Sequence, residues 1–250
     1  MKIAVCIKRT PDSETRFRIN SAGSAIDESG VKFDMDDFAS YAVEVALQMK
    51  EKAGSGEVVV IAVGPDSVQE TLRKAMSMGA DRAVQLKADA IPFDGLAVAK
   101  ALAAELKSGG FDLALFGKHA FDTSEAVVGT ATAELLDIAC VTAASKLEIA
   151  NGKGSARREL EGAAEMVEFS LPAVVTIDEG IARPRYPSLK GIMAAKKKPL
   201  ESKPAQLGAS RVTVKGMALP PDRPAGRIVG EGTAAVAELV RLLQTEAKVL

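Results

Sequence analysis

Short apolar runs alternate with longer amphipathic segments through the first 140 residues, and this alternation constrains the fold more than any other feature of the sequence. The runs at residues 2–7, 57–63, 83–86 and 111–116 have the length and composition of buried strands. Between them apolar residues recur at helical spacing, and we expect helices at about 38–51, from Asp66 or Ser67 to Met78, at 96–106 and at 123–136. Near-continuous apolar strands separated by helices predict an α/β fold whose parallel sheet is covered on both faces.

The pattern changes after Cys140. Strand-like segments follow at 147–149, 166–169 and 171–177, and we expect residues 151–154 to form a turn between the first two. From Arg183 the chain is rich in Pro, Lys and Arg, with little periodicity until a short helix expected at 234–243. A stretch of about fifty residues with so little regular structure is unusual inside a compact domain. We therefore expect an arm that wraps a partner; a partly disordered tail is the alternative.

The formal net charge is −1, so the composition gives no reason to expect binding to nucleic acid or to an anionic membrane. No apolar run approaches the roughly 20 residues of a membrane-spanning helix, and the N-terminus lacks a signal segment, so we expect a cytoplasmic protein without membrane insertion. The two cysteines, Cys6 and Cys140, are far apart, lie in apolar runs and have no histidine nearby. We expect both to be buried free thiols.

The sequence offers few catalytic groups. His119 is the only histidine, and no HExxH, CxxC or EF-hand pattern is present to bind a metal. The Gly117-Lys118 pair lacks the upstream glycine and following hydroxyl of a phosphate-binding Walker loop, and no GxGxxG follows the first strand. A chain of this fold class with so few reactive groups is more plausibly a binding protein than an enzyme.

Residues 116–130 are the best candidate for a ligand site. Parallel sheets bind ligands beyond the carboxyl ends of their strands, so the loops after Ile7, Val63 and Phe116 matter most. In the third loop Gly117 permits a tight turn, and Asp122, Thr123 and Ser124 would begin a helix whose N-terminus favours anions. Gly129 would allow a ligand to approach the backbone closely. An ordinary capped helix explains the same residues.

Residues 183–199 are a second candidate site. Lys196 to Lys198 could be a solvated charge run or a nucleic-acid patch, but the chain is not basic and Tyr186 is the only aromatic residue there. Leu189, Ile192 and Met193, framed by Pro and Gly, resemble an exposed apolar tip suited to docking a protein. The alternative is an ordinary packed loop.

These segments are similar to those of a known family. Residues 181–201, IARPRYPSLKGIMAAKKKPLE, resemble the signature of the beta (small) subunit of electron transfer flavoproteins. Residues 4–12 resemble the opening strand and loop of that family, 36–52 its first helix, and 64–86 its next strand–helix unit. With GKHAFD at 117–122 and LPAVVTID at 171–178, these motifs occur in family order and cover most of residues 1–200.

The resemblance implies a Rossmann-like, doubly wound parallel sheet of the adenine-nucleotide-binding type in residues 1–200, followed by a C-terminal extended arm and helix in 201–250 that wraps the partner. That partner would be the alpha subunit, which carries the redox-active FAD, and this subunit would hold AMP. The complex would exchange electrons with acyl-CoA dehydrogenases and pass them to a quinone oxidoreductase. Electron-bifurcating members of the family hold a second FAD in place of AMP and oxidise NADH.

The resemblance also assigns residues. Cys6 and Val63 would line the nucleotide pocket, Asp36 to Ala39 would flank adenine and ribose, and Phe38 would approach the flavin of the partner. Tyr186, Leu189, Ile192 and Met193 would dock the dehydrogenase, with Leu189 as the apolar anchor. The phosphate would lie among Phe116, Gly117, Lys118, Asp122, Thr123, Ser124, Glu125, Ala126, Val127, Val128, Gly129 and Thr130.

Two departures from the family pattern leave the nucleotide open. AMP-type members carry Asn-Gln-Thr-Gly, and bifurcating members Ala-Gln-Val-Gly-Pro, where this chain has Ala126-Val127-Val128-Gly129-Thr130. Both family patterns contain a Gln that this chain lacks here. Loss of its side-chain amide should remove one contact to the phosphate or ribose, at a cost of about 1–2 kcal/mol. Asp36 stands where AMP-type members often have Asn. AMP is the favoured ligand of this site, and the alternatives are a second FAD or an empty site. For the whole protein, the alternative function is a stand-alone nucleotide-binding regulator.

Overall fold

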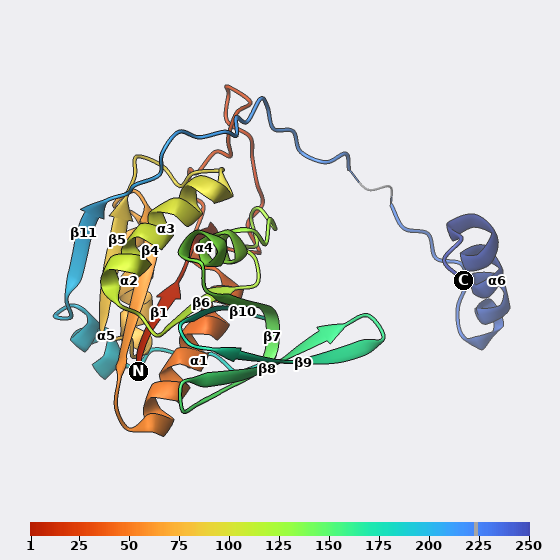
Figure 1. The fold of residues 1–250 in the computed structure, drawn as a ribbon. Helices are drawn as coiled ribbons and strands as arrows, with labels where there is room; N and C mark the ends of the chain where they lie inside the picture. The colour runs from red at the N-terminus through yellow and green to blue at the C-terminus, as the bar shows by residue number, and fades with distance from the viewer. Residues whose placement is uncertain (223–224) are drawn as a thin grey trace.

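The computed structural model describes residues 1–222 and 225–250 and has one large mixed sheet with helices on both faces (Figure 1). The strand order is β11-β5-β4-β1-β6-β10-β7-β8-β9, parallel from β11 to β7 and antiparallel in the last three strands. The parallel strands are β1 (Lys2–Cys6), β4 (Glu57–Gly64), β5 (Arg82–Lys87), β6 (Leu113–Gly117), β7 (Ala139–Ala150), β10 (Ala173–Ile177) and β11 (Leu200–Pro204). The predicted α/β fold with a doubly wound parallel sheet is confirmed.

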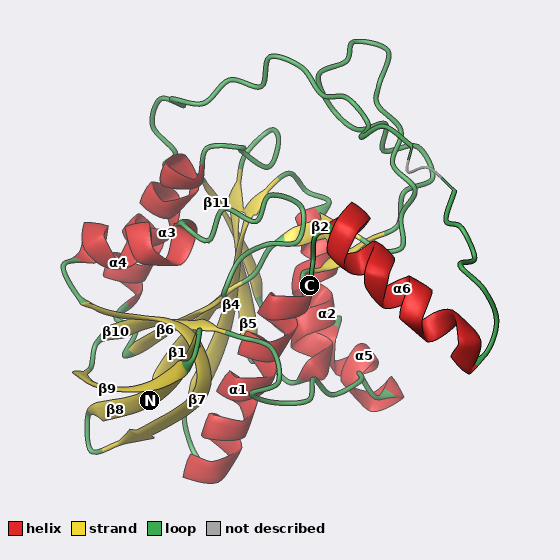
Figure 2. Cartoon of the chain, turned by 90° about the vertical axis from the view of Figure 1, so that its right-hand side faces the viewer, coloured by secondary structure: helices red, strands yellow, loops and turns green. Residues whose placement is uncertain are grey.

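Two pairs of helices sandwich the sheet (Figure 2). On one face α1 (Asp37–Ala53) and α2 (Val68–Met78) bury Val43 and Leu72 against the strands. On the other face α3 (Gly95–Gly109) and α4 (Val128–Leu136) bury Leu102 and Ala133. Because α1 and α2 follow β1 and β4 while α3 and α4 follow β5 and β6, the winding reverses beside β1. In such sheets the crevice at the reversal is the ligand site, here beyond the carboxyl ends of β1 and β6.

The last helix of this sandwich starts later than the sequence pattern indicates. We predicted a start near Thr123, but α4 begins at Val128. Ser124 and Ala126 have φ of 51° and 53°, left-handed values that a right-handed helix cannot contain. Residues 118–127 therefore form a loop over the end of the sheet. The expected side-chain cap of α2 is also absent, because Asp66 binds Lys87 and Gln85 instead.

The antiparallel extension contains one strand more than predicted. The turn at Asn151 and Gly152 joins β7 to β8 (Lys153–Leu160), which we had not predicted, and β8 leads through a second turn at Gly162 to β9 (Ala163–Ser170). The sequence of β8 is rich in charge and lacks clear alternation, so its strand character comes from pairing on both sides.

The segment after Arg183 is more structured than expected. It contains α5 (Leu189–Ala195) and the edge strand β11, which pairs with β5. Strand β11 spans the boundary that we predicted between the domain of residues 1–200 and the arm of residues 201–250. Beyond β11 the chain runs along the body, with Arg211 N–H donating to Asp94 at 2.7 Å.

The end of the chain leaves the body of the protein for a terminal helical segment of η1 (Thr233–Ala235), α6 (Val236–Leu242) and η2 (Leu243–Ala247) (Figure 1). None of the residues in these three elements is buried. A short antiparallel pair, β2 (Arg9–Pro11) and β3 (Phe33–Met35), lies between β1 and α1 in the sequence. No helix within residues 1–222 and 225–250 combines the length and apolar character that crossing a bilayer requires.

The cysteines differ from the prediction in one respect. Cys6 is a buried free thiol, and burial raises its pKa. Cys140 is free but exposed. Successive residues of a strand face opposite sides, and its neighbour Val141 takes the buried position in β7.

Candidate functional site

A pocket lies beyond the carboxyl ends of β1 and β6, where the winding of the sheet reverses. Its floor is formed by the strand ends, and its walls by the first turns of α1, α3 and α4 and the loop before α4. Of the predicted nucleotide residues, the lining includes Cys6, Asp36, Ala39, Val63, Phe116, Gly117, Lys118, Thr123, Glu125, Ala126, Val127, Val128 and Gly129. The structure thus brings together residues from four separate parts of the sequence.

Four predicted residues do not line this pocket. Phe38 packs its ring against that of His119, with centroids 4.5 Å apart. The Thr130 hydroxyl donates to the carbonyl of Val127 at 2.9 Å. Asp122 and Ser124 are exposed.

The pocket also contains residues that we had not predicted. They are Ile7, Lys8, Ile91, Pro92, Gly95, Val98 and Leu102. His119 and Ala120, which lie within the predicted segment 116–130, line the pocket as well. Lys8 begins the loop after Ile7 that the strand-end rule indicates, although the residue itself was not named. The wall from α3 and the loop before it has no local signal, because only the crossover geometry brings it to this end of the sheet.

Asp36 connects the start of α1 to the loop over the pocket. Its Oδ1 accepts hydrogen bonds from the N–H groups of Phe38 at 3.0 Å and Ala39 at 3.4 Å, so it caps α1. Its Oδ2 accepts one from Phe121 N–H at 2.7 Å. The side chain is nearly inaccessible, and burial raises its pKa against the opposing effect of the three N–H donors. Asp36 therefore acts on the pocket by ordering its wall.

The start of α4 has the properties of an anion site. Val127, at the N-cap, makes no side-chain capping bond, and the first-turn N–H groups of a helix have no partner within the helix. Ala126 is left-handed and Val127 right-handed, an alternation that turns successive N–H groups toward one point. Backbone donors and the positive end of the helix thus meet at the pocket wall.

Two glycines have packing roles different from those we predicted. A Cβ at Gly117 would lie 2.7 Å from the Cβ of Phe38 and 2.9 Å from the backbone nitrogen of Ala39, so this glycine admits the first turn of α1. A Cβ at Gly129 would lie 2.7 Å from Cγ2 of Thr176, so it seats α4 on the sheet. Both glycines bring helix starts close to the strands that form the floor of the pocket.

Both lysines that line the pocket are paired with carboxylates. Lys8 Nζ lies 2.6 Å from Oδ1 of Asp122 and 3.5 Å from the Thr123 hydroxyl. Lys118 Nζ lies 2.9 Å from Oδ2 of Asp178. Because Asp122 is engaged by Lys8, its charge is partly neutralised beside the anion site.

The predicted docking residues form an exposed surface elsewhere on the molecule. Tyr186 is 92% exposed, Leu189 84%, Met193 63% and Ile192 42%. We name residues 186–193 the docking segment. It includes the first turns of α5, whose Ala195 is buried. The Lys-rich run that follows is partly structural, since Lys198 Nζ donates to the carbonyls of Met76 at 2.9 Å and Ala80 at 2.6 Å at the end of α2.

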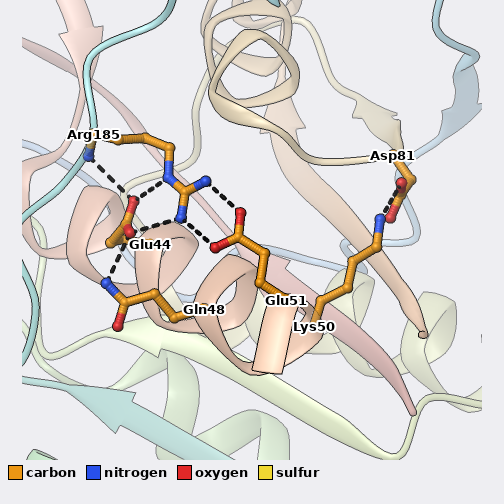
Figure 3. A network of polar contacts seen from close by, with 6 residues as sticks. All are labelled: Glu44, Gln48, Lys50, Glu51, Asp81 and Arg185. Atoms are coloured by element: carbon orange, nitrogen blue, oxygen red, sulfur yellow. Dashed lines mark hydrogen bonds and ion pairs between the residues drawn. The ribbon is translucent and has the colours of Figure 1, made fainter. Parts of the chain in front are cut away.

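Arg185, directly before the docking segment, binds two carboxylates of α1 (Figure 3). Its Nε and Nη2 donate to the two oxygens of Glu44 at 2.8 and 2.9 Å, and its backbone N–H donates to the same carboxylate at 3.2 Å. Its Nη1 and Nη2 donate to Glu51 at 2.5 and 3.0 Å. Glu44 also accepts from Gln48 at 2.8 Å. Burial raises the pKa of Glu44, but the bonds from Arg185 and Gln48 outweigh it and leave that pKa lowered.

The chain is similar to known proteins over its whole length. The model of the electron transfer flavoprotein domain matches residues 24–207, which include the loop over the pocket and the docking segment. The chain is 39% identical to the electron transfer flavoprotein subunit beta of Bradyrhizobium diazoefficiens over the full length of both. It is 36% identical to that of Syntrophomonas wolfei over all of this chain and 98% of the relative, and 37% identical to the human subunit over 96% of each. The chain belongs to the electron transfer flavoprotein family, among its beta subunits.

Proposed function

We propose that this chain is the beta subunit of a heterodimeric electron carrier, that it holds a structural AMP in the pocket beyond β1 and β6, and that electrons pass through an FAD in its alpha subunit. The observation that carries the nucleotide assignment is the uncapped start of α4 behind the left-handed Ala126. This corner offers backbone donors to a phosphate, while the apolar wall of Ile91, Val98 and Leu102 suits an adenine. AMP would stabilise the pocket and supply no redox chemistry.

The backbone donors also account for the missing amide. Ala126, Val127 and Val128 have no side-chain donor, but N–H groups are present whatever the side chain. Lys8 at the rim is paired with Asp122 and so offsets the negative charge of that carboxylate. A phosphate therefore has donors without the amide that other members carry, and occupancy by AMP is compatible with this sequence.

The docking segment is proposed to bind an acyl-CoA dehydrogenase, with Leu189 as the anchor. An apolar side chain that is 84% exposed at the start of a short helix has no stabilising role in the isolated chain. Burying it in a partner would gain about 1.5–3 kcal/mol. The complex would then pass the electrons to a quinone oxidoreductase.

The terminal helix is proposed to bind the alpha subunit. Val236, Leu239 and Val240 are exposed together on α6, which lies away from the body of the protein (Figure 1). Apolar residues on a helix held away from its own body are suited to wrapping a partner.

Analysis of the nucleotides released from the purified heterodimer tests the cofactor proposal. We expect one FAD and one AMP per heterodimer. Two FAD would instead assign the chain to the electron-bifurcating class, and NADH oxidation would then be measured. One FAD with no second nucleotide would refute the proposed occupancy of this pocket.

A further inference from the structure

The docking segment is exposed, yet it is tied to the body at both ends. At its C-terminal end Arg73 donates to the carbonyls of Ala195 and Lys198 at 2.5 and 2.8 Å. At its N-terminal end the ties come from Arg185 to Glu44 and Glu51 on α1, residues more than 130 positions earlier in the sequence. Within the segment, Gly191 packs against the carbonyl of Ser77 at the end of α2, where a Cβ would clash. This contact fixes α5, whereas Tyr186 before it is 92% exposed, so the position of the N-terminal part of the segment depends on the contacts of Arg185.

The contacts of Arg185 fix an orientation as well as a position. A guanidinium is planar, and its N–H groups on adjacent edges match two carboxylates in one geometry only. The backbone N–H of Arg185 donates to Glu44 as well, so the main chain is fixed one residue before Tyr186. Glu44 is almost completely buried within α1, which makes it a rigid support.

We propose that Arg185 is a positioning residue for docking: by its bonds to Glu44 and Glu51 it holds residues 186–193 in the arrangement that the dehydrogenase binds. This inference rests on the docking role proposed above. Without these bonds the segment samples other arrangements, and the apparent affinity falls in proportion to the fraction that stays competent. We expect electron transfer within the bound complex to be unaffected, because Arg185 lies outside the lining of the nucleotide pocket and its hydrogen bonds are to α1.

The test uses the heterodimer with a purified acyl-CoA dehydrogenase, reduced by octanoyl-CoA, as the electron donor. We expect Arg185→Gln to raise the KM for the heterodimer about tenfold, as it would if one arrangement in roughly ten stayed competent, with kcat, FAD content and nucleotide content unchanged. Arg185→Lys keeps the charge but loses the two-edged geometry, so it should behave nearly as Arg185→Gln does. Hydrogen exchange in residues 186–192 should accelerate in both variants.

Two further variants make the result decisive. Arg183→Gln is the matched control, because Arg183 is exposed two residues earlier and makes no side-chain hydrogen bond to the described residues; its KM should stay at the wild-type value. Glu51→Gln removes only an exposed carboxylate, so it tests the contact without risk to folding, and we expect about a threefold rise.

Leu189→Ala separates the inference from the function on which it rests. If Leu189→Ala raises KM while the Arg185 and Glu51 variants do not, the positioning role is wrong. Loss of FAD or a fall in kcat in Arg185→Lys or Glu51→Gln would also overturn it. If Leu189→Ala leaves KM unchanged, the docking function itself is wrong.

Discussion

Asp36 offers the sharpest test of how the pocket wall is held, since one carboxylate performs two separable tasks. Its Oδ1 caps α1, and its Oδ2 receives the Phe121 N–H at 2.7 Å. Serine is also a good N-cap residue, but it is shorter and has a single oxygen. Asp36→Ser should therefore keep the cap and lose the bond to Phe121, whereas Asp36→Ala should lose both.

The expected magnitudes follow from these bonds. A hydrogen bond to a charged group is worth about 1.5–3 kcal/mol. Part of this hydrogen-bond energy is offset in the wild type. Burial raises the pKa of Asp36, so keeping its carboxylate ionised above that pKa costs stability, and a serine removes this cost. For Asp36→Ser we expect the bond to Phe121 to account for a net loss of about 1.4 kcal/mol of stability in the loop. This free energy corresponds to a tenfold faster hydrogen exchange of the Phe121 amide. Asp36→Ala should lose about 1 kcal/mol more through the missing cap.

Hydrogen exchange followed by mass spectrometry, on the heterodimer and on peptides covering 117–127 and 36–46, measures both effects. In Asp36→Ser only the first peptide should exchange faster; in Asp36→Ala both should. An Asp36→Ser protein whose Phe121 amide exchanges at the wild-type rate would refute the idea that this carboxylate orders the loop. Equal exchange of 36–46 in the two variants would refute the capping role.

Two other perturbations probe the same framework. Gly117→Ala would place a Cβ 2.7 Å from the Cβ of Phe38, and we expect a loss of about 1–3 kcal/mol of stability by thermal denaturation; Gly226→Ala, with no atom within 4 Å and an ordinary φ, is the control, and equal melting of both would contradict the packing argument. The pKa of Glu44 is lower in the folded protein than its ordinary value of 4.5, so the ionised carboxylate stabilises the fold. This stabilisation is complete above pH 4.5 and is lost as the pH falls through the pKa of the folded state. The melting temperature of wild type should thus fall more steeply below pH 5 than that of Arg185→Gln, and parallel curves would count against this linkage.

The sequence predicted those parts of the site that follow from strand order. Cys6, Val63 and Phe116 lie at or next to the ends of three apolar runs, and parallel strands bring their carboxyl ends to one edge of a sheet. It did not predict where α4 begins. Ser124 N–H donates to the carbonyl of Ala120 at 2.8 Å and Asp36 fixes Phe121, and these contacts support left-handed residues that no local pattern indicates.

The docking segment shows a similar division. Leu189, Ile192 and Met193 could be recognised as an apolar tip because exposed apolar residues framed by Pro and Gly are a local feature. The helix they begin was missed, since its apolar residues face outward and give no signal of a buried face. Arg185 was missed as a contact because its carboxylate partners lie on α1, and a pairing over 141 residues leaves no trace in sequence spacing.

Helix α1 supports both proposed sites, and its packing explains why they can be held in a fixed relation. Asp36 at its start orders the pocket loop, and Glu44, eight residues later, holds the root of the docking segment about 12 Å along the axis. Between them Ala42 and Val43 are fully buried against the sheet. A close-packed interior resists small displacements of one helix against its neighbours. Neither Asp36 nor Glu44 can shift without disturbing this core, so the same helix keeps the proposed nucleotide pocket and the proposed docking segment at a constant separation.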